Sequence, residues 1–164
     1  MTAMTMIRLS PPPELDISLG EALFTQRAIR HLDHSQDISD DDLKLVLDAA
    51  SKAPSGGNAQ QIRFLVVRDR DKLRAFGKLY HEAWWAKRAE DSGWVVDQPL
   101  PEDSPMRMNA LLAREMVDAR VVVLGFVLDN SDIDVIPAAQ NLMLAARGLG
   151  IGSVLTTLHA CVME

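Results

Sequence analysis

Hydrophobic residues in this chain alternate between a spacing of three to four residues and short unbroken runs, which predicts helices and strands in turn. Two capping boxes indicate helix starts: Ser18 with Glu21, and Ser39 with Asp42. Apolar residues follow at positions 19, 22 and 23 and at positions 43, 46, 47 and 50. We expect the first helix to end near residues 27–30 and the second before Pro54, which cannot continue a helix.

Three further helices are expected. They cover Lys72 to about Ala89, the stretch around 109–117, and Ala138–Leu149, with Pro137 at the first helical position of the last one. That last helix is apolar nearly all round, so it must be buried in the core or against a partner. Gln140 and Asn141 lie on it, and a dimer interface and an internal hydrogen bond explain them equally well.

Three runs predict strands. Ile62–Val67 is short and β-branched and predicts a buried strand, Val121–Leu128 predicts a strand covered on both faces, and Ile151–Thr157 predicts a final strand. Glycines 148, 150 and 152 would end the last helix before it. The alternation alone suggests a layered α/β arrangement with helices on both sides of one sheet. It leaves the strand order open.

Length and composition indicate one globular domain. We divide the 164 residues into an N-terminal arm, 1–17, and a domain, 18–164. Residues 97–105 hold three prolines and three acidic residues, which predicts an exposed loop. Trp84, Trp85 and Trp94 are expected in the core or an interface.

Charge and cysteine usage exclude several classes. With 17 basic and 23 acidic residues the net charge is −6, so a nucleic-acid binder is not expected. The longest apolar run, Val121–Leu128, is far below the roughly 20 residues of a membrane helix. Cys161 is the only cysteine, and His31 and His34 fit a solvated turn better than a metal site. We expect a cytoplasmic protein without metal, membrane or nucleic-acid partner.

The segment between the second helix and the first strand carries the most informative chemistry. Pro54 fixes its own φ, and Gly56 and Gly57 let the backbone pass close to a flat ligand. Three neutral side chains add donors and acceptors: Ser55, Asn58 and Gln60. This lining suits a heteroaromatic ring with imide-like edges. A plain helix-to-strand connection explains the same residues.

Arg27 and Arg30 form a second candidate. If the first helix persists this far, their Cβ atoms lie on one face about 5 to 6 Å apart. Two guanidinium groups there could hold a phosphate. Cations that complement the helix dipole are the alternative explanation.

Three stretches in this order resemble the nitroreductase family of FMN-dependent oxidoreductases. They are Gln26–Arg30, Ala53–Phe64 and Pro137–Leu142 continuing through Gly150–Thr157, and the resemblance spans roughly residues 18–158. It implies an α+β class, with a three-layer α/β/α fold and a largely antiparallel central sheet. It also implies a homodimer with FMN at the subunit interface. This replaces the layered α/β arrangement that the alternation alone suggested.

The resemblance implies roles for individual residues. Arg27 and Arg30 match the positions that hold the FMN phosphate, with Ala28 where the family commonly has Ser, which leaves a backbone contact there. The loop that reaches the flavin from the second subunit is matched by Pro54, Ser55, Gly56, Gly57, Asn58 and Gln60. Leu155, Thr156 and Thr157 match a segment near the flavin.

Two departures from the family stand out. Gln61-Ile62 replaces a Pro-Trp pair, and the strand and basic tail with which the family continues are absent from this sequence, which ends at Glu164. Either the sequence is incomplete, or phosphate binding and dimerisation are weaker than in the family. The specificity loop, residues 91–117, cannot be interpreted.

The implied function is transfer of hydride from NAD(P)H through FMN to a small electron acceptor such as a nitroaromatic or a quinone. No side-chain acid, base or nucleophile is assigned. Two alternatives stay open: a flavin-binding or regulatory module without turnover, and specialised flavin or halogenated-aromatic chemistry.

Overall fold

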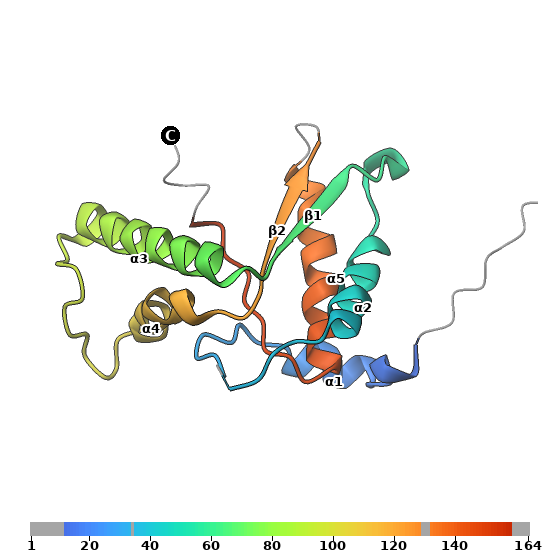
Figure 1. Ribbon diagram of the computed structural model, residues 1–164, viewed down its shortest axis with the longest axis horizontal. Coiled ribbons are helices and arrows are strands. Elements are labelled where there is room, and N and C mark those ends of the chain that lie inside the picture. The colour runs from blue at the N-terminus through green and yellow to red at the C-terminus, as the bar shows by residue number, and fades with distance from the viewer. Residues whose placement is uncertain (1–11, 34, 129–131, 159–164) are drawn as a thin grey trace, which may run out of the picture.

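The computed structural model describes residues 12–33, 35–128 and 132–158 (Figure 1). Over these residues the helices are α1 (Leu19–Thr25), α2 (Asp40–Ser51), α3 (Arg70–Ser92), α4 (Arg107–Glu115) and α5 (Val135–Gly148). The strands are β1 (Ile62–Val67) and β2 (Val122–Val127). Short 3₁₀ turns lie at Pro13–Leu15, Gly56–Asn58, Met116–Asp118 and Asp132–Asp134. The mixture of helices with an antiparallel sheet confirms the α+β class.

The two strands pair antiparallel, with Ile62 opposite Val127 and Val67 opposite Val122. Helix α5 packs against α2 beside this sheet, around buried Val46, Ala145 and Ala146 (Figure 1). The bounds predicted for the first strand are confirmed. Complete burial of the two strands is wrong, because Leu65 is 52% and Phe126 48% exposed. Side chains alternate across a strand, and the described residues bury one face of this pair more deeply than the other.

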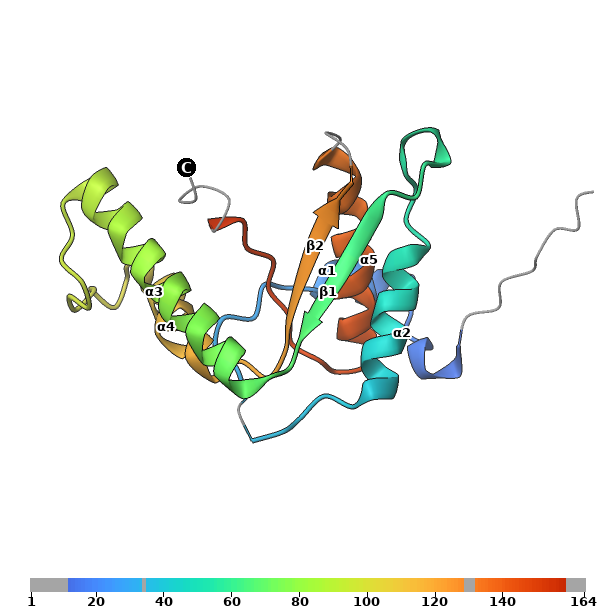
Figure 2. The same cartoon turned by 45° about the horizontal axis from the view of Figure 1, so that its top comes forward.

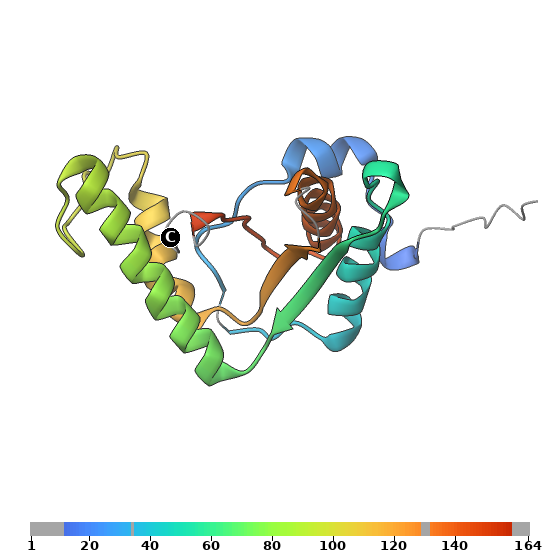
Figure 3. The same ribbon diagram turned by 90° about the horizontal axis from the view of Figure 1, so that it is seen from above.

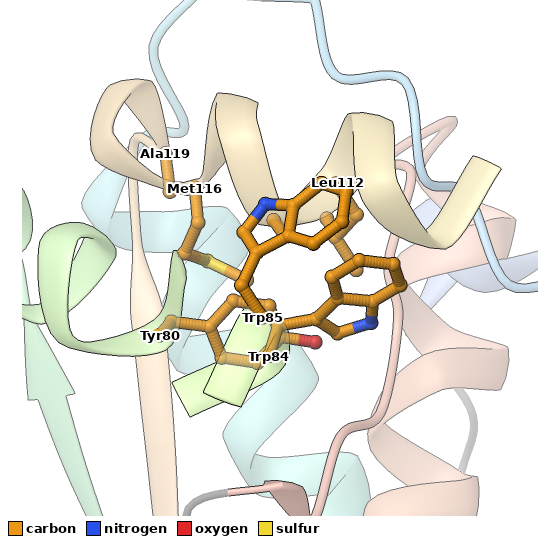
Figure 4. Close-up of a cluster of buried hydrophobic side chains, with 7 residues drawn as sticks. Tyr80, Trp84, Trp85, Leu112, Met116 and Ala119 are labelled. Carbon is orange, nitrogen blue, oxygen red and sulfur yellow. The ribbon is translucent and has the colours of Figure 1, made fainter. Parts of the chain in front are cut away.

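A second cluster joins α3, α4 and the turn that follows α4. Its buried residues are Tyr80, Trp84, Trp85, Leu112, Ala113, Met116 and Ala119 (Figure 4). The rings of Trp84 and Trp85 meet edge to face, 4.8 Å between centroids, and Trp94 packs on the cluster. The core position predicted for the tryptophans is therefore confirmed. Figures 2 and 3 show this α3–α4 unit on one side and α1, α2 and α5 on the other, joined by the strands.

Helix ends follow local chemistry. Ser18 Oγ accepts from the backbone N–H of Glu21, and Ser39 Oγ from that of Asp42, which confirms both predicted caps. Helix α5 ends at Gly148 and is followed by the left-handed Gly150, and the N–H groups of Gly150 and Ile151 donate to carbonyls of the last turn. Glycine has no Cβ to oppose this conformation.

Three details of the prediction are wrong. Helix α1 ends at Thr25 and Gln26 is extended, so Arg27 and Arg30 do not lie on a helix face. Residues 151–157 form no strand, since Ser153 accepts one backbone bond, from Ile29, and no described strand lies alongside to complete a ladder. Pro137 is the third residue of α5 rather than the first. Proline is tolerated there too, because the N–H groups of the first turn make no hydrogen bond within the helix.

Candidate functional site

The loop before β1 is held together by its own polar side chains. Ser55 Oγ accepts from both the backbone N–H and the side-chain amide of Gln60, each at 3.1 Å. The same amide group donates to Asn58 Oδ1 at 2.9 Å. Asn58 Nδ2 and Gln60 Oε1 are left without a hydrogen-bond partner among the described residues. One donor and one acceptor therefore remain available on an exposed loop.

The backbone of this loop is strongly curved. Gly57, Asn58 and Gln60 have φ of 57°, 56° and 53°, all in the left-handed region. Asparagine tolerates this region better than most residues with a Cβ, and glycine adopts it freely. A Cβ built on Gly57 would meet no heavy atom within 4 Å, so its backbone conformation, rather than crowding, favours glycine here.

Asp134 fastens the loop to the start of α5. Both of its carboxylate oxygens lie 3.1 Å from the backbone nitrogen of Gly56, which donates to them. Sequence reasoning missed this contact, because 78 residues separate the two positions. Asp134 carries no motif that would have pointed to it.

The arginine segment lies at the other end of α5. Ile29 donates its backbone N–H to the carbonyl of Ser153, just beyond the helix. Arg27 is exposed and donates to the carbonyl of Gln26 at 2.7 Å, and Arg30 reaches the carbonyl of Ala28 at 3.5 Å. Neither guanidinium group lies within 4.0 Å of a carboxylate of the described residues. Two unpaired cations three residues apart suit an anion in a chain of net charge −6.

A cavity of about 210 Å³ borders this segment. Arg27 lines it together with Arg147 of α5 and Ser153. Arg147 was not among the predicted residues, and it is already engaged, donating to Thr25 Oγ1 at 3.1 Å and to Glu21 Oε1 at 3.3 Å. Arg147 thus ties α5 to α1 beside the arginine segment.

Glu115, at the end of α4, holds the residues that follow the arginines. Its carboxylate accepts from the backbone N–H of Leu32 at 3.4 Å and lies 3.1 Å from His31 Nδ1. The side chain of Glu115 is 17% exposed, whereas that of His31 is 71% exposed. His34 lies outside the described residues, and the described part of the chain contains no group of three or more His, Cys, Asp or Glu side chains that could hold a metal.

Residues 155–157 run beside α3. The hydroxyl groups of Thr156 and Tyr80 share a hydrogen bond of 3.2 Å, and Tyr80 is 8% exposed. Leu155 is 46% exposed and Thr157 is also exposed. Tyr80 therefore helps to position this segment. The sequence did not reveal this role, because Tyr80 lies on the apolar face of its helix.

One copy of the chain does not bring the predicted site residues together. The loop around Gly56 contacts the residue before α5, and Arg27 borders the turn after α5. At 1.5 Å per residue, the 14 residues of α5 span about 21 Å. Figure 1 shows the two segments at opposite ends of this helix.

The fold and these segments define an α+β protein with a polar loop and an arginine pair at opposite ends of one helix. The chain belongs to the nitroreductase family, whose model matches residues 23–160. The resemblance drawn from the sequence is therefore confirmed. No helix in the described parts of the chain is long and apolar enough to cross a membrane.

A relative from Archaeoglobus fulgidus named "Putative NADH dehydrogenase/NAD(P)H nitroreductase" is 35% identical over 132 residues. The match covers 80% of this chain and 63% of the relative, so this chain spans less than two thirds of that protein's length.

Solved structures show the same fold. A BluB-like flavoprotein from Clostridium difficile superposes with a TM-score of 0.61 at 22% identity, covering 88% of this chain and 76% of that one. An FMN-dependent nitroreductase from Mycobacterium smegmatis, in complex with NADPH, gives 0.53 at 21% identity, covering 79% and 70%. These similarities confirm a nitroreductase-like fold.

Proposed function

We propose that this protein is an FMN-dependent oxidoreductase that takes hydride from NAD(P)H and passes electrons to a small acceptor such as a nitroaromatic or a quinone. Family membership and the FMN-dependent, NADPH-bound structural relative support this assignment. The observation in this chain that carries it is the pair Arg27 and Arg30, exposed to different degrees and without a carboxylate partner among the described residues.

The donor set fits FMN. Two guanidinium groups match the charge and the several acceptors of a phosphate dianion. The free amide donor of Asn58 and the free carbonyl of Gln60 complement an imide, which presents one N–H beside two carbonyl groups. When bound, FMN supplies the redox chemistry, and the side chains bind and orient it.

We infer that the site is completed by a second copy of the chain. Arg27 and Arg30 of one subunit, together with residues 155–157, would meet the loop from Pro54 to Gln60 of the other. The separation of about 21 Å along α5 supports this arrangement, because one FMN phosphate and ring cannot be bound at both ends within one copy. The protein would then be a homodimer. We also propose a cytoplasmic location, which the single cysteine supports because the sequence given cannot form a disulfide within itself.

The absorbance spectrum of the purified protein tests the cofactor. We expect a flavin spectrum, with the flavin released on denaturation identified as FMN. A protein that stays colourless after incubation with excess FMN would contradict the proposal.

Steady-state oxidation of NADH and NADPH, with a quinone and a nitroaromatic as acceptors, then tests turnover. Bound flavin without turnover over several acceptors would identify the binding or regulatory module instead. Turnover confined to a halogenated aromatic would identify the specialised chemistry.

A further inference from the structure

A cavity of about 770 Å³ lies between α3, α4 and the loop that joins them, the region labelled α3 and α4 in Figure 1. Pockets for small organic ligands typically have roughly 300 to 1,000 Å³. None of the residues predicted to bind FMN lines it. Within one copy of the chain, its lining therefore shares no residue with the proposed flavin site.

The walls of this cavity are mostly apolar. Trp85 of α3 is among the lining residues but is only 2% exposed, so Met108 and Leu111 of α4 provide accessible apolar surface. Pro99 and Leu100 close it from the loop. The indole N–H of Trp85 has no acceptor among the described residues. These side chains offer a surface on which a flat hydrocarbon ring can be buried.

Three cations converge on the same cavity: Lys78 from α3, and Arg107 and Arg114 from α4. Arg107 and Arg114 are seven residues apart, two turns along one face of the helix. None of the three lies within 4.0 Å of a carboxylate of the described residues. Single exposed cations are ordinary, but three around one apolar cavity in a chain of net charge −6 create a local positive site.

The acidic residues of the lining do not cancel this charge. Asp97 Oδ1 lies 2.9 Å from Nε2 of His81 of α3, which also lines the cavity. Glu82 is the other acidic residue among the lining side chains. Among the lining side chains, the three Lys and Arg cations stand against two carboxylates, and the Asp97 carboxylate is hydrogen-bonded to His81.

Hydrogen bonds tie together the loop that borders the cavity. Asp97 has φ of +57°, and the backbone N–H of Gln98 donates to the carbonyl of Val95 at 3.1 Å. The side-chain carbonyl of Gln98 accepts in return from Val95 N–H at 2.8 Å. The bond between His81 and Asp97 fixes this turn to α3. These bonds set the shape of the loop at the edge of the cavity.

We propose that this cavity binds a small aromatic carboxylate, with its ring against Met108 and Leu111 and its carboxylate between Arg107 and Arg114. The apolar walls accept the ring, and planar guanidinium groups bind a carboxylate better than a neutral group. The proposal does not rest on the function proposed above, because it uses no residue of the flavin site.

Calorimetric titration with naphthoate tests this site. It uses the full chain with whatever flavin it carries after purification. Naphthalenemethanol, which keeps the ring but lacks the charge, is the matched ligand. We expect saturable binding of one naphthoate per chain and at least about tenfold weaker binding of the alcohol. Saturating FMN should leave naphthoate binding unchanged.

Two variants locate the ligand. Met108→Glu places a negative charge on a cavity residue that is 44% exposed, and it should weaken naphthoate binding at least about tenfold, while Met108→Gln should change it little. The double variant Arg107→Gln with Arg114→Gln should also weaken naphthoate binding at least about tenfold. The matched control is Lys72→Gln with Arg74→Gln, two exposed α3 cations outside the cavity.

Three results would overturn the proposal. They are no saturable binding at millimolar naphthoate, equal affinities of the Met108→Glu and Met108→Gln variants, and displacement of naphthoate by FMN. Flavin content, measured on each sample, reports separately on the flavin proposal. A chain that binds naphthoate but never flavin would refute that proposal and leave this one standing.

Discussion

Asp134 and Gly56 are joined across the end of the sheet by a backbone N–H that lies 3.1 Å from each oxygen of the Asp134 carboxylate. This contact ties the start of α5 to the loop that precedes β1. Since the arginine segment contacts the opposite end of the same helix, α5 sets the distance between the two halves of the proposed flavin site.

Asp134→Ala removes this anchor. A hydrogen bond to a charged acceptor contributes on the order of 1 to 2 kcal/mol, so flavin affinity should fall about five- to thirtyfold as the loop loses its fixed position. Asp134→Asn keeps an acceptor and should lose less. Fluorescence titration with FMN measures both variants, and equal affinities for Asp134→Ala and wild type would show that the anchor does not serve the flavin.

Replacing Arg27 and Arg30 together by Ala should release the flavin. Each charge-assisted contact is worth about 1.5 to 3 kcal/mol, and no described carboxylate competes for either guanidinium group. Lys44→Ala with Arg74→Ala removes the same charge from exposed helix positions and should keep flavin bound. Wild-type affinity in the arginine double variant would contradict the phosphate assignment.

Substitutions at Gly57 test whether the loop before β1 lines the flavin or is only a turn. At φ of 57° a β-branched residue costs about 1 to 2 kcal/mol, so Gly57→Val should lower stability in either case. If the loop lines the flavin, the folded variant should also lose flavin, whereas Gly57→Asn, which tolerates this φ, should keep it. Circular dichroism measures whether the variant is folded, and flavin fluorescence on the same sample measures how much flavin it binds. Folded Gly57→Val with normal flavin content would mean that the site lies elsewhere.

Mixed dimers test whether the loop acts on the second subunit. A chain carrying Arg27→Ala with Arg30→Ala, mixed and refolded with a Gly57→Val chain, should regain about one flavin site in four, because half of randomly paired dimers contain one intact site. Each variant alone should regain none. Flavin bound stoichiometrically by a monomer in light scattering would contradict the shared site.

Gly77 permits the closest approach between α3 and the turn after α4. A Cβ there would lie 2.4 Å from both the Cα and the N atoms of Val117, which are backbone and cannot swing aside. Gly77→Ala should therefore destabilise the protein by about 3 kcal/mol or more, despite the higher helix propensity of alanine. Leu79→Ala, at a position 64% exposed, is the control for urea unfolding.

Local chemistry determined much of this protein from the sequence alone. The caps at Ser18 and Ser39, the strand Ile62–Val67 and the tryptophan cluster follow from short-range spacing, because the groups that satisfy a helix end or define an apolar face lie within a few residues. The order of three motifs was enough to indicate the family before the fold was known.

Only the tertiary structure decided which contacts form between segments that are far apart in the sequence. Residues 151–157 look like a strand, yet a strand exists only where another lies alongside, and none does among the described residues. Asn141, which the sequence left between an interface and an internal bond, donates to the carbonyl of Ala49. Hydrogen bonds of this kind depend on how α2 and α5 pack against each other, which the spacing of residues along the chain does not predict. The same reason hid Asp134, Arg147 and Glu115, and it placed the arginine pair and the polar loop at opposite ends of α5.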